Sequence, residues 1–219
     1  MHWAVPERAI RDLVPTEIGI DLFDGQAYLT LIPFRIEHSR PAGMPRTLAI
    51  RMLEINLRTY VRGPDGEAGI YFFSLDASSP LAVAAARLLY GLPYHLAAMS
   101  VDRRDRRVTY RSCRRLGLRA DLDLEYVTGA ERAPASPGTL DHFLVERYRL
   151  YVRRGRTLYQ TQVRHSPYPL CAVQVNRIHE TLLEAAHVPR PGFPAACHFS
   201  PGVDVEIFWR ERVQLSPLL

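Results

Sequence analysis

The sequence predicts a mainly β protein of the α+β class: an antiparallel barrel or curled sheet with three or four short helices outside it. Three observations predict this fold. Polar and apolar residues alternate without a break over residues 53–61, which is the period of a β-strand with two different faces. Turn-forming pairs such as Asp24-Gly25 separate the apolar segments, as they do in β-hairpins. The segments with helical spacing are few and short.

The first part of the chain is predicted to form hairpins around the alternating segment. The turn at residues 63–66, Gly-Pro-Asp-Gly, returns the chain through 69–76, so the strand at 53–61 should have an antiparallel partner. The other elements expected before residue 78 are a short helix at 6–14, a hairpin of strands 18–23 and 26–34 around Asp24-Gly25, and a loop rich in proline and glycine from Ser39 to Thr47.

The second part begins with a helix, because Ser78-Ser79-Pro80 combines hydroxyl N-caps with proline at the first helical position. Residues 81–90 are almost wholly apolar, so we expect this helix to be buried on most sides and Arg87 to need a partner or a route to solvent. The remaining expected elements are strands at 94–101, 107–116, 148–152, 158–165 and 202–209, and helices at 140–146 and 176–186.

Length and composition fit one globular domain over residues 1–219, with 47% hydrophobic and 23% charged residues. No stretch approaches the ~18 apolar residues of a membrane span, and no leader-like pattern opens the chain, so a cytoplasmic location without membrane contact is expected. The three cysteines, Cys113, Cys171 and Cys197, lie far apart and form no Cys-x-x-Cys pair. Neither a disulfide framework nor a structural zinc site is therefore expected.

All 28 basic residues are arginine, and lysine is absent. No side-chain amine can form a Schiff base with a carbonyl substrate or with pyridoxal phosphate, and no P-loop lysine can hold a nucleotide phosphate. Genomic base composition or a thermophilic habit explains an arginine-only chain better than function does. The absence nevertheless excludes whole classes of mechanism.

The polar face of the 53–61 strand carries Glu54, Asn56, Arg58 and Tyr60. A carboxylate, an amide, a guanidinium and a phenol are unusual on a solvent-facing strand, so we expect them to line an internal cavity. Arg58 would bind a carboxylate or phosphate, Glu54 would act as the base, and Asn56 and Tyr60 would supply hydrogen bonds. The alternatives are a structural network in which these four side chains satisfy one another, or a solvated face.

Ser74 and Asp76 share a face of the partner strand and could add a second acid to the site. A cap of the following helix by Asp76 or Ser78 is the preferred interpretation. Tyr94, His95 and His165 lie close to polar strands and are candidates for acid–base work near neutral pH, although a structural role is more frequent for such histidines.

Residues 146–151 alternate if they form a strand, which would bring Arg147 or Tyr151 to the same interior as Arg58. A helix end with outward arginines is an equal alternative. No His-x-His or His-Glu-x-x-His pattern is present, so the site is expected to use neither a metal nor a cofactor.

The densest basic region surrounds the expected hairpin tip at 102–106, and the net charge is +5. Acidic residues interrupt it and no nucleic-acid-binding motif appears, so a solvated tip is expected rather than a nucleic-acid surface. Exposed hairpin edges favour a homodimer.

Six segments, spread in order over nearly the whole chain, together resemble one family. They are Asp24-Gly25, EINLRTYV at 54–61, GIYFFSLDA at 69–77, GLPY at 91–94, ERYRLY at 146–151 and HSPYPL at 165–170. The chain resembles the YqjF-like family of uncharacterised bacterial proteins, domain of unknown function 2071. That family is distantly similar to the acetoacetate decarboxylase-like fold, which implies a β-cone with an interior site. Decarboxylases of that group use a catalytic lysine, so the resemblance implies an architecture and argues against that reaction here.

The sequence therefore leads to two hypotheses. In the first, a small anionic organic molecule binds inside the barrel and undergoes lysine-independent acid–base chemistry at Glu54 and Arg58. In the second, the protein is a non-catalytic binding or interaction protein whose internal polar network is structural.

Overall fold

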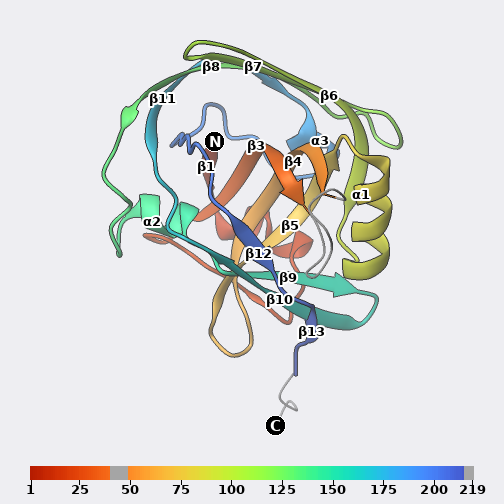
Figure 1. Cartoon of the computed structure of the whole chain (residues 1–219). Coiled ribbons are helices and arrows are strands. Elements are labelled where there is room, and N and C mark those ends of the chain that lie inside the picture. Colours follow the sequence, from red (N-terminus) through yellow and green to blue (C-terminus); the bar gives the residue numbers. More distant parts are fainter. Residues whose placement is uncertain (40–48, 215–219) are drawn as a thin grey trace.

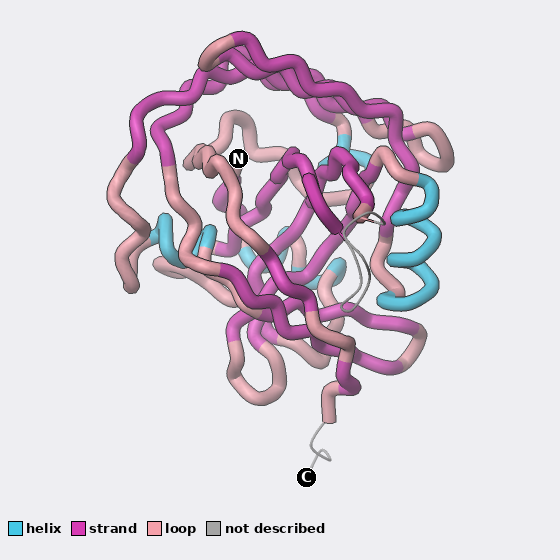
Figure 2. The backbone as a smooth tube through the Cα atoms, viewed as in Figure 1, coloured by secondary structure: helices cyan, strands magenta, loops and turns pink. Residues whose placement is uncertain are grey.

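The computed structural model describes residues 1–39 and 49–214 and shows a sheet curled into a half-barrel (Figure 1). Over these two described ranges, thirteen strands form the sheet, and its main path runs β1-β3-β4-β5-β6-β7-β8-β11. Figure 2 shows strands over most of the chain and only short helices. The predicted mainly β fold class is confirmed.

The strands are β1 (His2–Val5), β2 (Gly19–Ile20), β3 (Ala27–Ser39), β4 (Ile50–Arg62), β5 (Ala68–Ala77), β6 (Tyr94–Arg104), β7 (Arg107–Arg114), β8 (Asp121–Glu131), β9 (Arg149–Arg154), β10 (Thr157–His165), β11 (Cys171–Glu180), β12 (Val205–Ile207) and β13 (Glu211–Arg212). The α-helices are α1 (Pro80–Ala85), α2 (Leu140–Val145) and α3 (Leu182–Ala185). Among the described residues, no helix has the length and apolar character needed to cross a bilayer.

Strand β4 is the expected alternating strand, and it pairs with β3 on one side and antiparallel with β5 on the other. Its pairing with β5 shifts by one residue: Leu57 lies opposite Ser74, whereas Arg58 lies opposite Phe72. Phe73 is therefore an extra residue in β5, while the alternation along β4 stays unbroken. The two faces of β4 consequently keep their separate characters.

Each face of the central strands packs into its own apolar cluster. On one face, Ile55 and Leu57 pack with Trp3 and with residues of β7, β8 and α3. On the other face, Tyr60 packs with Tyr94 and with side chains from α1 and α2. The polar residues of β4 lie on this second face, because they alternate with Ile55 and Leu57.

The expected helix at 176–186 is wrong over its first half. Residues 171–180 form β11, which pairs with β8, and only Leu182–Ala185 are helical. Val173 and Val175 alternate and are β-branched, so they favour an extended backbone that pairing with β8 stabilises. The strand β8 itself was missing from the sequence prediction.

The N-terminal elements also differ from expectation. Two 3-10 helices, Glu7–Ala9 and Arg11–Leu13, replace the helix at 6–14. The Asp24-Gly25 turn forms as predicted, with positive φ at both residues. The hairpin around it is confirmed only at its tip, where Phe23 and Gln26 form an antiparallel bridge; farther along, β2 pairs with β4 rather than with β3. Except for Ser39, the expected loop from Ser39 to Thr47 lies outside the described residues.

The apolar helix at 80–90 is present, but it is not buried on most sides. It consists of α1 and a π-helical extension, Ala86–Tyr90, and Leu81 and Leu88 are 68% and 70% exposed. Val83 is its buried contact with the sheet. The Arg87 guanidinium donates to the carbonyl oxygen of Tyr94 at 2.6 Å, which provides its expected partner.

The other expected elements occur with shifted ends. Strands β6, β7, β9 and β10 and helix α2 lie where the sequence predicts them, whereas the expected strand at 202–209 is reduced to the three residues of β12.

Candidate functional site

The polar face of β4 is buried inside the curled sheet. Glu54 and Tyr60 are 3% and 0% exposed, Asn56 is buried, and Arg58 is half-buried. No hydrogen bond or ion pair between described residues joins any two of these four side chains. The alternative of a network in which they satisfy one another is therefore wrong, and each of them is held by other parts of the fold.

Glu54 has a nearly apolar environment. Its Oε2 accepts a hydrogen bond of 3.0 Å from the phenol of Tyr94, so the structure brings this predicted residue to Glu54. Burial raises the pKa of Glu54 to about 8, and the Tyr94 hydrogen bond opposes this rise only in part. A carboxyl group with a pKa near neutrality can both take up and release a proton under physiological conditions.

Arg58 has no acidic partner among the described residues, and the segments outside them contain no Asp or Glu. Its Nη2 donates to the carbonyl oxygen of Leu144 at 3.3 Å, and its buried Nε has no hydrogen-bond partner. Two other arginines buried in this fold are each paired with an aspartate: Arg114 with Asp76 and Arg147 with Asp21, both at 2.8 Å. Arg58 thus keeps donors free for an anion.

The phenol of Tyr60 converges with Arg58 on the same carbonyl group. Its hydroxyl donates to the Leu144 oxygen at 2.8 Å. The Arg58 guanidinium lies 5.8 Å from the centre of the Tyr60 ring, and that of Arg147 lies 5.1 Å from it. The structure therefore brings Arg147 to the interior that holds Arg58. This agrees with the first of the two predicted alternatives, rather than with outward arginines at a helix end.

Ser74 and Asp76 do not reach this interior. They lie opposite Leu57 and Ile55, so their side chains share the other face of the sheet. Asp76 does not cap a helix either, since its carboxylate accepts from Nε and Nη2 of Arg114. The cap of α1 is the hydroxyl of Ser79, which accepts from the Ala82 amide. Both sequence interpretations of Asp76 are wrong, because the Arg114 that pairs with it lies on a distant strand.

Tyr151 is also separated from Arg58. It lies in a third apolar cluster with Val14 and Val61, and its hydroxyl donates to the carbonyl oxygen of Glu67. His165 lies at the end of β10, where its ring stacks at 4.5 Å on Tyr148 and one ring nitrogen lies 3.3 Å from the Arg147 carbonyl oxygen. His165 is thus a neighbour of the site through Arg147.

His95 lies beside Asp76 rather than beside Glu54, since these two residues are paired in the β5–β6 register. Burial lowers its pKa to about 4, with the Arg114 charge acting in the same direction. A group with this pKa is neutral near pH 7, so His95 cannot supply the positive charge of an acid there.

Sequence reasoning missed four residues that extend the site from Tyr60. They are Thr30 on β3, His2 on β1, His198, and Asp141 on α2, and they form one continuous chain of hydrogen bonds. The alternation of residues 26–34 could have placed Thr30 on the inner face. His198 lies in a segment without a periodic pattern, so nothing in the sequence points to it.

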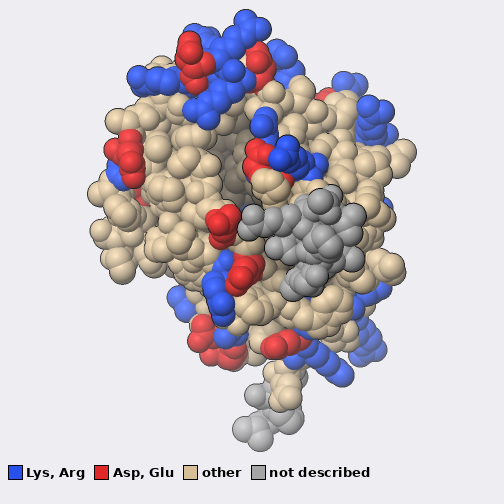
Figure 3. All heavy atoms as spheres, in the orientation of Figure 1, with Lys and Arg blue, Asp and Glu red and all other residues tan. Residues whose placement is uncertain are grey.

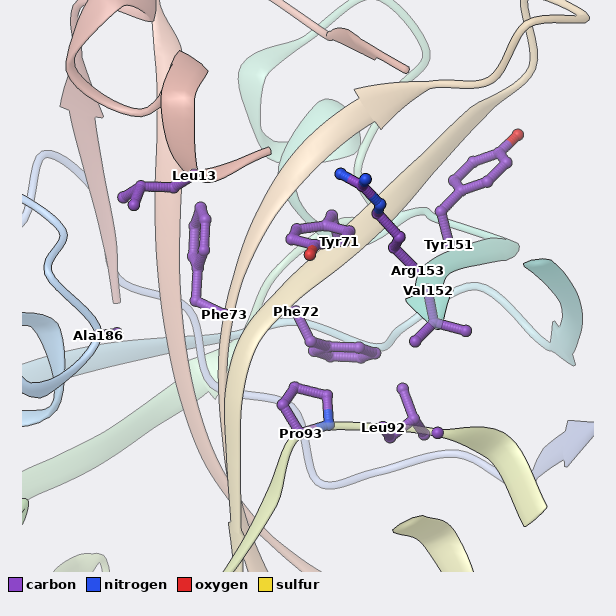
Figure 4. Close-up of a pocket in the computed structure, with 11 residues that line it drawn as sticks. Leu13, Tyr71, Phe72, Phe73, Leu92, Pro93, Tyr151, Val152, Arg153 and Ala186 are labelled. Carbon is purple, nitrogen blue, oxygen red and sulfur yellow. The ribbon is translucent and has the colours of Figure 1, made fainter. Parts of the chain in front are cut away.

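A hollow and a pocket mark two places on the surface. Figure 3 shows a hollow on the viewed face, beside the place where β1 and the N-terminus lie in Figure 1. A separate pocket of about 250 Å³ is lined mainly by apolar and aromatic residues, among them Tyr71, Phe73 and Pro93, and also by the charged Arg153 (Figure 4). Of the predicted site residues only Tyr151 lines that pocket, so it is distinct from the polar face of β4.

The arginine-rich hairpin of β6 and β7 carries charges of both signs (Figure 3). Ion pairs join Arg104 to Asp102 at 3.1 Å and Arg107 to Glu125 at 2.6 Å. These pairs offset part of the local positive charge.

Comparisons with known proteins agree with the resemblance seen in the sequence. The family model DUF2071, described as an uncharacterised conserved protein, matches residues 1–204. The uncharacterised protein YqjF of Bacillus subtilis is 34% identical over 212 residues, which is 96% of this chain and 87% of that protein.

Solved structures share the fold at low identity. The acetoacetate decarboxylase of Legionella pneumophila is 13% identical with a TM-score of 0.53, over 97% of this chain and 82% of that chain. The enduracididine biosynthesis enzyme MppR complexed with pyruvate is 11% identical with a TM-score of 0.57, over 95% and 81% of the two chains. The fold is thus acetoacetate decarboxylase-like, and by its sequence the chain belongs to the DUF2071 family of uncharacterised conserved proteins.

Proposed function

We propose that this protein binds a small organic anion through Arg58 and moves a proton on it through Glu54, without a lysine. The observation that supports this proposal is the free guanidinium of Arg58. Its buried Nε lacks a partner, whereas Arg114 and Arg147 are paired with aspartates. A partly buried guanidinium with free donors is suited to a carboxylate, which accepts two parallel hydrogen bonds.

The spacing along β4 limits the shape of the ligand. At a rise of about 3.3 Å per residue, the Cα atoms of Glu54 and Arg58 are about 13 Å apart. Arg58 extends toward Leu144 and Tyr60, and Asn56 lies between the two charged residues with an unbonded Oδ1. We infer that the preferred ligand is extended, with its carboxylate at Arg58 and its reacting carbon nearer Glu54.

The chemistry proposed for Glu54 is proton transfer at a carbon next to a carbonyl group. The carboxylate takes a proton from this carbon, the electron pair of the C–H bond moves toward the carbonyl oxygen, and that oxygen gains a proton from a nearby donor. The relatives suggest probes for this step. One solved neighbour holds pyruvate, a 2-oxo acid, and others are named for acetoacetate, a 3-oxo acid.

Thermal unfolding in the presence of oxo acids tests the binding step. The probes are pyruvate, acetoacetate and straight-chain 2-oxo acids of increasing length. A probe at about 100 times its Kd stabilises the native state by about 2.7 kcal/mol, which raises Tm by roughly 5–10 °C for a chain of this size. We expect the longer acids to give the larger shift, and Arg58→Ala to abolish it.

The matched control is Arg51→Ala, which removes an exposed arginine from the same strand and should leave the shift intact. A shift that survives in Arg58→Ala would contradict the proposed anion site. Proton NMR of the probes in D2O then separates an enzyme from a binding protein, because catalysed proton transfer replaces C–H by C–D and removes the C–H signals. A probe that shifts Tm but keeps its C–H signals would support the non-catalytic alternative.

A further inference from the structure

A continuous hydrogen-bond chain runs from the surface of the protein to Tyr60. Asp141 Oδ1 lies 2.8 Å from His198 Nε2, and His198 Nδ1 lies 3.0 Å from His2 Nε2. His2 Nδ1 is 2.8 Å from the hydroxyl of Thr30, which is 2.8 Å from the hydroxyl of Tyr60. The last contact is the 2.8 Å hydrogen bond from Tyr60 to the Leu144 carbonyl oxygen.

Burial along this chain changes steadily. The side chain of Asp141 is 31% exposed and that of His198 is 7% exposed. His2, Thr30 and Tyr60 are buried, at 3%, 0% and 0% exposed. A partly exposed carboxylate is thus connected to an enclosed phenol through polar groups that water does not reach.

In the form that carries an extra proton on His198, with Tyr60 donating to Leu144, the direction of every hydrogen bond follows from its inner end. A carbonyl oxygen cannot donate, so Tyr60 must donate to Leu144 and must accept from Thr30. Thr30 has one hydrogen and must therefore accept from Nδ1 of His2. His2 is then neutral and accepts at Nε2 from Nδ1 of His198. His198 therefore carries a hydrogen on Nδ1. A second hydrogen, between its Nε2 and Asp141, is present only when the His198–Asp141 pair holds an extra proton.

We propose that Asp141, His198, His2 and Thr30 form a proton relay that ends at Tyr60, and that Tyr60 donates a proton to the anion bound at Arg58. The ligand in this proposal rests on the proposed function above. Tyr60 and Arg58 meet at the same carbonyl oxygen, so a ligand held by Arg58 lies within reach of the phenol.

One passage of a proton through the relay is balanced. Tyr60 gives its proton to a basic oxygen of the ligand and receives the proton of Thr30. Thr30 receives the Nδ1 proton of His2, and His2 receives at Nε2 the Nδ1 proton of His198. The His198 imidazolium becomes neutral and keeps its Nε2 hydrogen toward the Asp141 carboxylate. His2 thereby changes its tautomer. The chain is reset when the Asp141–His198 pair takes up a proton from solvent, the His2 hydrogen returns from Nε2 to Nδ1 and the hydroxyls of Thr30 and Tyr60 turn back to their first directions.

Several charged groups act on the two histidines. Burial lowers the pKa of His198, while Asp141 opposes this and Arg132, which is paired with Asp141, adds to it. Burial also lowers the pKa of His2, with the Met1 amine, His198 and Arg58 acting in the same direction. We call the relay loaded when His198 carries the extra proton. Because burial lowers the pKa of His198, the loaded relay gives up this proton readily.

Nitrogen NMR of the ligand-free protein tests the relay directly. Histidine-labelled protein is followed from about pH 8 to about pH 5, and His2 and His198 are assigned by single substitutions. We expect His2 to carry its hydrogen on Nδ1 when His198 is protonated and on Nε2 when His198 is neutral. Asp141→Asn should keep His2 in the Nε2–H form throughout, and Asp141→Glu should restore the change.

Thr30→Val separates a relay from a purely structural contact. It interrupts the path between His2 and Tyr60, so the tautomer of His2 should still follow the protonation of His198 through their direct contact. Like Tyr60→Phe, it should nevertheless weaken the binding of the best oxo-acid probe about tenfold or more. The control is Thr59→Val, which removes a buried hydrogen bond to Tyr28 on the opposite face and should alter neither readout.

A tautomer of His2 that does not change as His198 titrates would overturn the relay. So would a Thr59→Val variant with the same effects as Thr30→Val. Because the spectra need no ligand, failure of the relay is distinguishable from failure of the anion site, which is measured by the loss of the probe shift in Arg58→Ala.

Discussion

Replacement of Glu54 by Gln is expected to stabilise this protein, and increasingly so as the pH rises. Burial holds the pKa of Glu54 at about 8, against an ordinary value of 4.5. The native state therefore keeps a proton that the unfolded chain loses between these two values, and stability falls as the pH rises through this window. At about 1.36 kcal/mol per pKa unit, the raised pKa of Glu54 lowers the free energy of unfolding by about 3 kcal/mol at pH 7 and by about 5 kcal/mol above pH 8.

Urea unfolding at about pH 5, 7 and 9 measures this effect. The free energy of unfolding of Glu54→Gln should exceed that of the wild type by a margin that grows with pH and levels off above pH 8. The matched control is Glu131→Gln, an exposed glutamate on β8, which should change the free energy by less than about 0.5 kcal/mol. A margin that is the same at all three pH values would show that Glu54 ionises normally.

A gain of this size has a functional meaning. A buried carboxyl group without a cationic partner destabilises the fold in its ionised form, and such groups are concentrated at sites that use them. Gln keeps the shape of Glu54 and can still accept from Tyr94. The same variant should therefore be more stable and unable to transfer a proton.

The second large effect is expected at the buried pair of Asp76 and Arg114. Asp76→Asn leaves the guanidinium of Arg114 buried without a counter-charge, which costs about 3–5 kcal/mol of the free energy of unfolding. Replacement of both residues, Asp76→Leu with Arg114→Met, should recover most of this loss, because it removes the buried charge as well.

The exposed pair of Arg104 and Asp102 is the control for this result. Its side chains are 83% and 61% exposed, so Asp102→Asn should change stability by less than about 1 kcal/mol. If Asp76→Asn were as mild as Asp102→Asn, the Asp76 pair would not be isolated from solvent. Chemical denaturation of the four proteins decides between these outcomes.

The central strand could be predicted from the sequence because its pattern is local. Alternation over 53–61 specifies both the strand and which residues share a face, and the turn at 63–66 specifies the antiparallel partner. Asp76 could not be placed in the same way. One extra residue in β5, Phe73, shifts the register, and Arg114 comes from a strand that only the tertiary fold brings near.

The strand at 171–180 and the relay also depend on tertiary contacts that a local sequence pattern does not specify. Residues 176–186 contain apolar residues at both spacings, and pairing with β8 decides the outcome for the first half. The relay joins residues 2, 30, 60, 141 and 198, each of which looks ordinary in its own segment. Polar contacts between distant segments leave no periodic pattern in a sequence.

The contact between the first strand and the segment near residue 196 has a consequence for the order of folding. The His2 amide donates to the Ala196 carbonyl oxygen at 2.9 Å, and the Trp3 indole donates to the Gly192 carbonyl oxygen at 3.0 Å. Contacts between residues so far apart along the chain form late, because a loop of almost the whole chain must close first. Strand β1 can pair with β3 early in synthesis, but its contacts with Gly192 and Ala196 must wait for nearly all of the chain to leave the ribosome. The proton path to Tyr60, which includes His198, is therefore completed only when folding is almost finished.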